Sequence, residues 1–132
     1  MNPSSPDAEL VRREERGRWA EHAAAAFLRL RGYRILARRE RTPYGEIDII
    51  ARRRHRISFI EVKFRRSRDA AEAALTPKQA RRVAKAAAHW ISKRPAYDNY
   101  EQAFDAVFIV PWKWPELVPD AYEPIATSGR ML

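Results

Sequence analysis

The sequence predicts an α/β fold in which the elements follow the order α-β-β-β-α-β around a mixed central sheet. Two segments with helical periodicity bracket a run of short segments rich in β-branched residues, and the second leads to a last apolar strand. Tight turns join antiparallel strands, whereas a helical crossover returns the next strand parallel to the one before it. The 132 residues, 45% of them apolar, suffice for one core. We therefore expect a single domain spanning residues 1–132.

The first element is predicted as a helix over residues 9–30. Its apolar side chains recur with the period of a helix and lie on one broad stripe made of Ala20, Ala23, Ala24, Phe27, Leu28 and Leu30. Gly32 follows as a residue type that commonly ends helices. Residues 1–7, rich in Ser and Pro, are expected to form a disordered end before the helix.

Three strands are predicted after this helix. Residues 33–39 form an exposed strand, which the turn-forming sequence Thr-Pro-Tyr-Gly at 42–45 separates from a second strand at 46–51. A basic turn at 52–56 then leads to a third strand at 57–64. A connection this short makes the second and third strands antiparallel.

A second helix is predicted after a polar connection at 65–75. Thr76 has a side chain that caps helices, and Pro77 occupies the first helical position, where proline is best tolerated. The helix is expected to end near Arg94, before Pro95. It carries an apolar stripe with a basic face beside it, which is typical of a helix that covers a sheet.

The last strand is predicted at 104–110, where a nearly continuous apolar run is typical of a strand covered on both faces. These elements place the structured core at about residues 9–110. The remaining segment, 111–132, is rich in Pro and is predicted as loop with one short edge strand around 122–126.

Composition excludes several classes of protein. Without cysteine the chain has no disulfide, thiolate zinc site, iron–sulfur cluster or thiol nucleophile. His22, His55 and His89 are scattered, so a zinc site made of histidines alone is not expected. The chain shows neither the ~18 consecutive apolar residues of a membrane span nor the apolar run of a signal peptide. We expect a soluble, cytoplasmic protein.

The positive charge is unevenly distributed along the chain. The net charge is +9 and the isoelectric point is about 10.5. Residues 1–96 hold 24 basic and 11 acidic side chains, whereas residues 97–132 hold 2 and 6. A basic body of this kind indicates a polyanionic partner, most simply nucleic acid. An anionic membrane surface and simple solubility are the alternatives that composition leaves open.

Two carboxylates interrupt the apolar pattern of the second and third strands. Side-chain alternation places Asp48 on one face with Ile50, and Glu61 on one face with Phe59 and Lys63. Burial of an unpaired carboxylate costs several kcal/mol, a large share of the ~5–15 kcal/mol that stabilises a domain. These acids therefore form either an internal ion pair with Lys63 or a nearby arginine, or a functional site.

A functional site here would suit a divalent metal. The carboxylates of Asp48 and Glu61 and the backbone carbonyl of Val62 are hard oxygen ligands of the kind that Mg²⁺ or Mn²⁺ prefers. Lys63 would orient a water or neutralise charge on a phosphoryl group. Glu21 borders the apolar stripe of the first helix and either leans toward the sheet as a further acid or stays solvated. Such a set suits metal-assisted hydrolysis of a phosphodiester.

The same residues resemble a known signature. Gly45-Glu46-Ile47-Asp48 followed by Glu61-Val62-Lys63 resembles the metal-binding core of the PD-(D/E)XK nucleases, the restriction-endonuclease-like superfamily. Together with residues 17–36, 59–65 and 76–82, these elements resemble the YraN family of small bacterial proteins, which is similar to archaeal Holliday-junction resolvases. The resemblance covers residues 16–110 and implies a restriction-endonuclease-like, three-layer fold.

The resemblance also implies roles for individual residues. Asp48 and Glu61 would be metal ligands, and Lys63 would be the catalytic lysine. Glu21 would be a helix-borne acid that assists metal binding. Gln79 resembles a helix-borne polar residue that some related nucleases place near the site, with an ordinary position on the helix surface as the alternative.

Several cations flank the predicted site and would contact phosphates without reading sequence. Those expected to bind nucleic acid together with Gln79 are Arg38, Arg41, Arg65, Arg66, Lys78 and Arg82. The arginines at 52–56 belong to the far end of the hairpin and are expected to form a solvated turn. Trp112 and Trp114, flanked by prolines, either stack on bases or cover a hydrophobic edge.

These observations lead to one leading function and two alternatives. We expect a nucleic-acid-binding endonuclease, dependent on Mg²⁺ or Mn²⁺, that hydrolyses phosphodiester bonds in structured or branched DNA, and no membrane partner. The branched substrate follows from the resemblance alone. A homodimer would match the twofold symmetry of a DNA junction. The alternatives on the same fold are a non-catalytic nucleic-acid-binding module and an interaction subunit.

Overall fold

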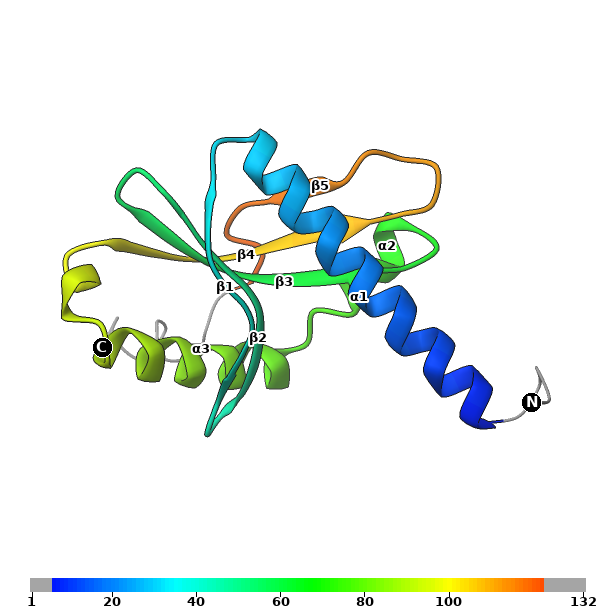
Figure 1. Cartoon of the computed structure of the whole chain (residues 1–132), viewed down its shortest axis with the longest axis horizontal. Coiled ribbons are helices and arrows are strands. Elements are labelled where there is room, and N and C mark those ends of the chain that lie inside the picture. The colour runs from blue at the N-terminus through cyan, green and yellow to red at the C-terminus, as the bar shows by residue number, and fades with distance from the viewer. Residues whose placement is uncertain (1–5, 123–132) are drawn as a thin grey trace.

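The computed structural model describes residues 6–122, which form a central sheet with helices on both faces (Figure 1). This three-layer arrangement confirms the predicted α/β class. In chain order the elements are α1 (Pro6–Leu30), β1 (Arg34–Thr42), β2 (Gly45–Arg53), β3 (Arg56–Phe64), α2 (Arg68–Ala73), α3 (Pro77–Ser92), the short 3₁₀ helix η1 (Pro95–Tyr97), β4 (Glu101–Ile109) and β5 (Glu116–Val118).

The sheet has five strands in the order β1-β2-β3-β4-β5. β1, β2 and β3 form an antiparallel meander, β4 pairs with β3 in parallel, and β5 pairs with β4 antiparallel. The crossover from β3 to β4 runs through α2 and α3, because parallel neighbours need a long connection. The predicted mixed sheet is therefore confirmed, and the apolar strand β4 lies inside it.

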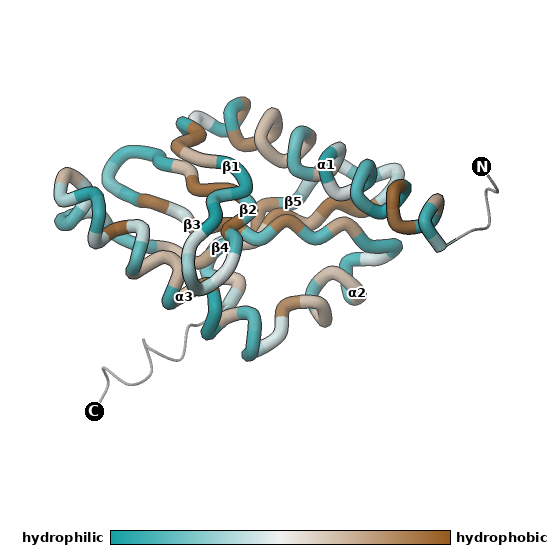
Figure 2. Tube along the Cα trace, turned by 60° about the horizontal axis from the view of Figure 1, so that its bottom comes forward, coloured by the Kyte–Doolittle hydropathy of each residue, from teal (hydrophilic) through white to brown (hydrophobic). Residues whose placement is uncertain are grey.

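Apolar side chains fill the space on both faces of the sheet. α1 packs Leu28 against a face that includes Ile60, and α3 packs Val83 against the opposite face at Phe59. α2 adds the buried Ala71 beside β4. Figure 2 shows the apolar middle strands enclosed between these helical layers. Among residues 6–122, no helix combines the length and hydrophobicity needed to cross a membrane.

β2 and β3 pair over only part of their length. Their register ends at Ile49↔Ile60, although both strands continue beyond this pair. β1 stays paired with β2 as far as Thr42↔Gly45, so the two strands leave the sheet together and curl over α3 (Figure 1). Ile47 accordingly packs into the core beneath α3. The diverging ends of β2 and β3 form an open fork at one end of the sheet.

The two ends of α1 differ from the prediction. The helix begins at Pro6, so the expectation that a disordered end extends to residue 7 is wrong for its last two residues; residues 1–5 lie outside the described part of the chain. Leu30 is 84% exposed, although it was placed on the apolar stripe. It lies about 200° around the helix from the buried Leu28, because each residue advances the helix by about 100°.

Three elements after β3 are absent from the prediction, namely α2, η1 and β5. α2 occupies part of the expected polar connection, and the Ser67 side chain caps it by accepting the Ala70 N–H (3.1 Å). The edge strand is β5, whereas Tyr122, at the start of the strand predicted for 122–126, lies in no strand. The rest of that predicted strand is outside the described residues.

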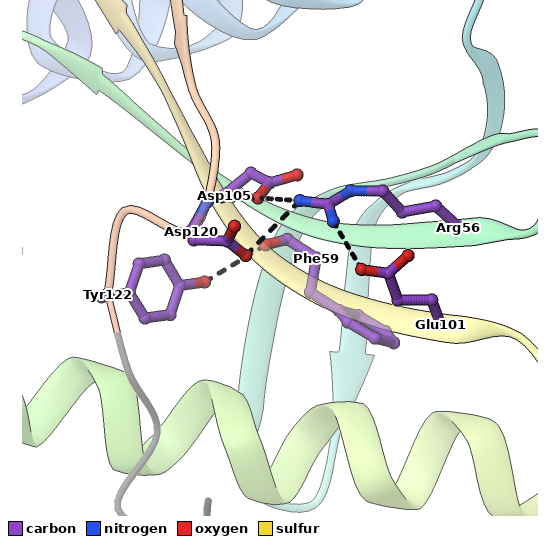
Figure 3. Close-up of polar contacts among 6 residues, drawn as sticks. All are labelled: Arg56, Phe59, Glu101, Asp105, Asp120 and Tyr122. Atoms are coloured by element: carbon purple, nitrogen blue, oxygen red, sulfur yellow. Dashed lines mark hydrogen bonds and ion pairs between the residues drawn. The ribbon is translucent and has the colours of Figure 1, made fainter.

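An ion-pair network around the buried Asp105 fixes the far end of the sheet (Figure 3). Arg56, the first residue of β3, donates to Glu101 (2.8 Å) and Asp105 (3.2 Å) of β4 and to Asp120 after β5 (3.4 Å). Asp105 is fully buried and also accepts the Asp120 N–H (2.8 Å). The expectation that Arg56 belongs to a solvated turn is therefore wrong, because its guanidinium joins β3 to β4 and to the segment after β5.

Candidate functional site

The fork between β2 and β3 opens into a cavity of about 820 Å³. Residues of α1, β2, β3 and α3 line it, because the missing strand pairing lets both helical layers reach the opening. The four residues predicted to be catalytic, Glu21, Asp48, Glu61 and Lys63, all lie in this lining. The structure therefore brings together side chains that are separated by up to 42 positions in the sequence.

Asp48 holds the fork at the point where the strands separate. Its Oδ2 accepts the backbone N–H of Val62 (2.9 Å), on the strand that β2 no longer pairs with at this position. The carboxylate thus satisfies a backbone donor that would otherwise lack a partner, and such a donor is costly when shielded from water. The Asp48 side chain is only half-buried and faces the cavity.

Glu61 is buried and is held by α3 and by its own strand. Its Oε2 accepts a hydrogen bond from Gln79 Nε2 (2.9 Å) and lies 3.8 Å from Lys63 Nζ. The position of Gln79 follows from the helix start, since Thr76 Oγ1 accepts the Gln79 N–H (3.2 Å) and caps α3 as predicted. Gln79 therefore reaches the site through its side chain and is not simply a surface residue of α3.

Burial raises the pKa of both carboxyl groups. The pKa of Asp48 rises from 3.8 to about 6, mainly through burial, while the hydrogen bond from Val62 acts in the opposite direction. The pKa of Glu61 rises from 4.5 to about 8, first through burial and then through the negative charge of Asp48, against the opposing charge of Lys63. Two neighbouring acids that resist ionisation indicate a place where additional positive charge would be stabilising.

The ligands in the fork fit a divalent metal only in part. Residues 6–122 contain no cluster of three or more His, Asp or Glu side chains placed to hold a metal ion. However, Asp48 Oδ1 and Glu61 Oε1 accept no hydrogen bond from any described residue. Mg²⁺ is often bound by one or two carboxylates and completed by waters and substrate phosphates. Together with the Val62 carbonyl, the two carboxylates fit a site of that kind.

Glu21 reaches the same cavity from α1. Its side chain is buried and forms an ion pair with Arg39 of β1. The sequence allows Glu21 either to lean toward the sheet or to stay in solvent, and in the structure it leans toward the sheet. The negative charge of Glu21 also contributes to the raised pKa of Asp48, so the two acids are close enough to interact.

Five cationic side chains line the cavity: Arg13, Arg16, Lys63, Arg65 and Arg82. Arg65 and Arg82 are among the residues predicted to bind nucleic acid, whereas the two arginines of α1 are not. Their presence means that the fork is lined by positive charge from α1, β3 and α3. A phosphate entering it would meet cations on several sides.

The other predicted cations lie outside this lining. Arg38 lines a separate cavity of about 250 Å³. Arg41 is exposed and its Nε lies 3.7 Å from a carboxylate oxygen of Glu46. Arg66 and Lys78 are exposed and adjoin cavity residues in sequence. These four residues form an outer set of cations, whereas Arg65 and Arg82 belong to the site itself.

Gly45 allows Arg82 to lie against the turn between β1 and β2. Its φ is +128°, and a Cβ at this position would lie 2.7 Å from Arg82 Cδ. Real Cβ atoms do not approach so closely, and the backbone conformation itself favours glycine. Glycine is therefore required at position 45 of the predicted signature, because the Arg82 side chain of α3 approaches the turn between β1 and β2 closely.

Comparison with known proteins places these residues in a family. The model of uncharacterised protein family UPF0102 matches residues 20–109, which include Glu21 and both strands of the fork. A UPF0102 protein of Rhodopseudomonas palustris strain BisB5 is 49% identical over 123 residues, covering 92% of this chain and 94% of that protein. One from Nitrobacter winogradskyi is 51% identical over 104 residues, covering 79% and 88%. One from Parvibaculum lavamentivorans is 47% identical over 105 residues, covering 80% and 79%. The chain therefore belongs to the UPF0102 family, the YraN-type group that its sequence resembles.

Proposed function

We propose that this protein is a metal-dependent endonuclease that hydrolyses phosphodiester bonds in structured or branched DNA. The observation that supports it most is the convergence of Asp48, Glu61 and Lys63 at the fork, inside a cavity otherwise rich in arginine. The resemblance of these residues to the PD-(D/E)XK signature supports the reaction class, and the resemblance to junction resolvases supports the branched substrate.

Asp48 and Glu61 would hold Mg²⁺ or Mn²⁺ with the carbonyl of Val62, and Glu21 would assist from α1. When bound, the cation would supply Lewis acidity and positive charge for hydrolysis of the phosphodiester. Gln79 would fix the orientation of Glu61, since it already donates to Oε2 (2.9 Å). Partners of this kind keep a metal ligand in place.

Lys63 would act on the substrate phosphate. Its side chain is largely buried beside Glu61, so its ammonium group sits in a site partly shielded from water. A fixed positive charge in such a place stabilises the negative charge that develops on a phosphoryl group. Arg65 and Arg82 would hold the neighbouring phosphates, which gives affinity without sequence specificity.

A cleavage assay tests this proposal. Labelled four-way junction DNA and linear duplex of the same sequence are incubated with wild type, Lys63→Ala and Lys93→Ala in Mg²⁺ or Mn²⁺, with EDTA as the blank. Lys93 is an exposed lysine at the end of α3 and serves as the matched control. We expect wild type and Lys93→Ala to cut the junction at equal rates, and Lys63→Ala to cut at least ~100-fold more slowly.

Two results would contradict the proposal. Absence of cutting by a folded wild-type protein in both metals would remove the enzymatic function and leave a binding module. Equal cutting by wild type and Lys63→Ala would assign the activity to another protein in the preparation. A common melting temperature for the three proteins shows that the comparison is between folded chains.

A further inference from the structure

We propose that a tryptophan groove next to the fork binds unstacked nucleobases of a single-stranded segment. The groove lies between α1 and the loop after β4 and has a volume of about 580 Å³; its large lining side chains are Trp19, Phe27, Leu30, Phe64, Trp112 and Trp114. This inference rests on the proposed function, because it adds a substrate class to it: DNA with unpaired bases close to the bond that is cut.

The two tryptophans of the loop do not serve the core of the described chain. Trp112 and Trp114 are 102% and 87% exposed, so they do not cover a hydrophobic edge of residues 6–122. Neither ring packs on another aromatic ring of that part of the chain. Together with Trp19 and Leu30, which are 56% and 84% exposed, they form a contiguous exposed apolar patch, and patches of this kind mark interaction sites. Of the two positions that the sequence allows, covering an edge or meeting bases, the geometry points to the second.

The backbone at Trp112 adopts a conformation that non-glycine residues seldom adopt. The Lys113 N–H bonds the Val110 carbonyl (3.2 Å) and closes a turn with Pro111 and Trp112 at its centre. Trp112 has a φ of +67°, a conformation that favours Gly or Asn in this position. A bulky side chain here is unfavourable for the folded chain and gains no burial in return. Arg39, Arg54 and Asp120 also have a positive φ, so the unusual feature at Trp112 is that a large aromatic side chain adopts it while fully exposed. Residues in such conformations cluster at active sites and ligand-binding sites.

The groove adjoins the fork. Phe64 follows Lys63 directly and lines both the cavity of the fork and the tryptophan groove. Trp19 packs edge-on against Phe64, with ring centroids 5.5 Å apart. Arg16 and Trp19 share a further cavity of about 490 Å³ with Phe64, and Arg16 also lines the fork. A strand that leaves the catalytic cavity would therefore pass onto aromatic side chains.

Charge favours a nucleic acid over a protein as the occupant. Lys113 is the one charged residue among those that line the groove, and it stands between the two exposed tryptophans. Arginines lie at the fork end. Aromatic rings flanked by cations bind single strands because every base has a face for stacking and every phosphate a negative charge. A single base on one ring contributes enough to be measured by substitution.

Binding to base-containing and abasic strands tests the inference. Fluorescence anisotropy in EDTA compares wild type with the double variant Trp112→Ala/Trp114→Ala on labelled oligothymidylate and on an abasic oligonucleotide of equal length. Both ligands carry the same phosphates, so their difference reports the bases. We expect wild type to prefer the base-containing strand by about 5-fold or more and the double variant to lose that preference.

Three further variants separate stacking from other causes. Trp112→Phe keeps an aromatic face and should retain a preference for bases. Leu10→Ala removes an apolar side chain of α1 that is 56% exposed and lies outside the groove, and should leave the preference unchanged. Trp112→Gly should lose the preference yet melt no lower than wild type, because glycine accepts the positive φ.

The outcomes distinguish this inference from the proposed function. Equal binding of both strands by wild type, or a preference that survives in the double variant, would overturn base binding by the groove. Neither result would bear on the proposed endonuclease. Sedimentation that shows a wild-type dimer dissociated by the double substitution assigns the groove to a second copy and also overturns the inference. Because EDTA excludes cleavage, the binding assay does not depend on nuclease activity. A base preference in a protein that fails the cleavage assay would support the groove and contradict the proposed enzyme. Lys93→Ala, which removes the exposed control lysine, is expected to keep the preference.

Discussion

The carboxylate of Asp48 accepts the backbone N–H of Val62 (2.9 Å) across the gap where β2 and β3 stop pairing. One side chain thus does two things. It satisfies the backbone donor that the open fork exposes, and it presents its other oxygen to the cavity. The fold and the proposed chemistry are coupled at this residue, so substitutions there have to be compared by shape as well as by charge.

Asp48→Ala and Asp48→Asn are therefore expected to differ in stability. Alanine leaves the Val62 N–H without a partner and should lower the free energy of unfolding by about 1–3 kcal/mol. Asparagine keeps an acceptor in the same place and should lower it less, while removing the charge needed for a metal. Urea unfolding of the two variants beside wild type measures this. An equal loss in both would show that the hydrogen bond does not stabilise the fork.

The pH dependence of stability is set in part by Glu61. Its pKa is raised to about 8 in the folded chain against 4.5 for an exposed carboxyl, so between these values the folded state holds a proton that the unfolded state releases. Under chelator, the free energy of unfolding should then fall as pH rises through this window and level off above it. Each unit of pKa difference is worth about 1.4 kcal/mol.

Glu61→Gln should lose the pH-dependent part of the free energy of unfolding that Glu61 contributes, because glutamine has no proton to release. Thermal unfolding at a series of pH values with EDTA gives the difference in free energy of unfolding between wild type and Glu61→Gln at each pH. We expect the advantage of the variant over wild type to grow by at least ~1 kcal/mol from the acidic to the alkaline end. Parallel curves for the two proteins would contradict the raised pKa of Glu61.

Gly45→Ala should disturb both the hairpin and the position of Arg82. The new Cβ would lie 2.7 Å from Arg82 Cδ, and the φ of +128° disfavours a side chain in any case. We expect a loss of about 1–3 kcal/mol in the free energy of unfolding. The double variant Gly45→Ala/Arg82→Ala should recover the steric part but not the backbone part. If Arg82→Ala recovers nothing, the two residues are not in contact.

Arg56→Ala tests the network that holds β3 to β4. It removes the charged partner of the fully buried Asp105, which keeps only the Asp120 N–H, and a buried charge without an opposite charge costs about 3 kcal/mol or more. Arg54→Ala, an exposed neighbour, should change stability by less than ~0.5 kcal/mol. Equal, small effects of both substitutions in chemical denaturation would show that Arg56 is not structural.

The elements that follow local rules could be predicted from the sequence. The Thr76 cap, the turn at Gly45 and the apolar pattern of the strands depend on neighbours in sequence, and the structure has each in place. α2 was missed because six residues are too few to show a helical period. Leu30 was misplaced because a broad stripe tolerated a residue on the far face of the helix.

The fork itself could not be predicted, because it is a missing pairing between two strands that both look complete. Contacts made across it, such as Gln79 with Glu61 and Arg39 with Glu21, depend on where the helices lie. The sequence does contain a partial signal that the arginines of α1 lie near the site. Arg13 precedes Glu21 by eight residues, with Gly17 between them at i+4, and this spacing puts all three on one face of the helix.

Whether Asp48 and Glu61 hold a divalent cation at the fork is measured by paramagnetic broadening. Mn²⁺ titrated into the isotopically labelled protein broadens the NMR signals of nearby backbone amides, and the wild type, Asp48→Asn and Glu14→Gln are compared. Glu14 is an exposed acid of α1 and controls for loss of one negative charge. We expect broadening centred on residues 47–48 and 61–63 in wild type and Glu14→Gln, and its loss in Asp48→Asn. Broadening centred elsewhere, or unchanged in Asp48→Asn, would contradict it.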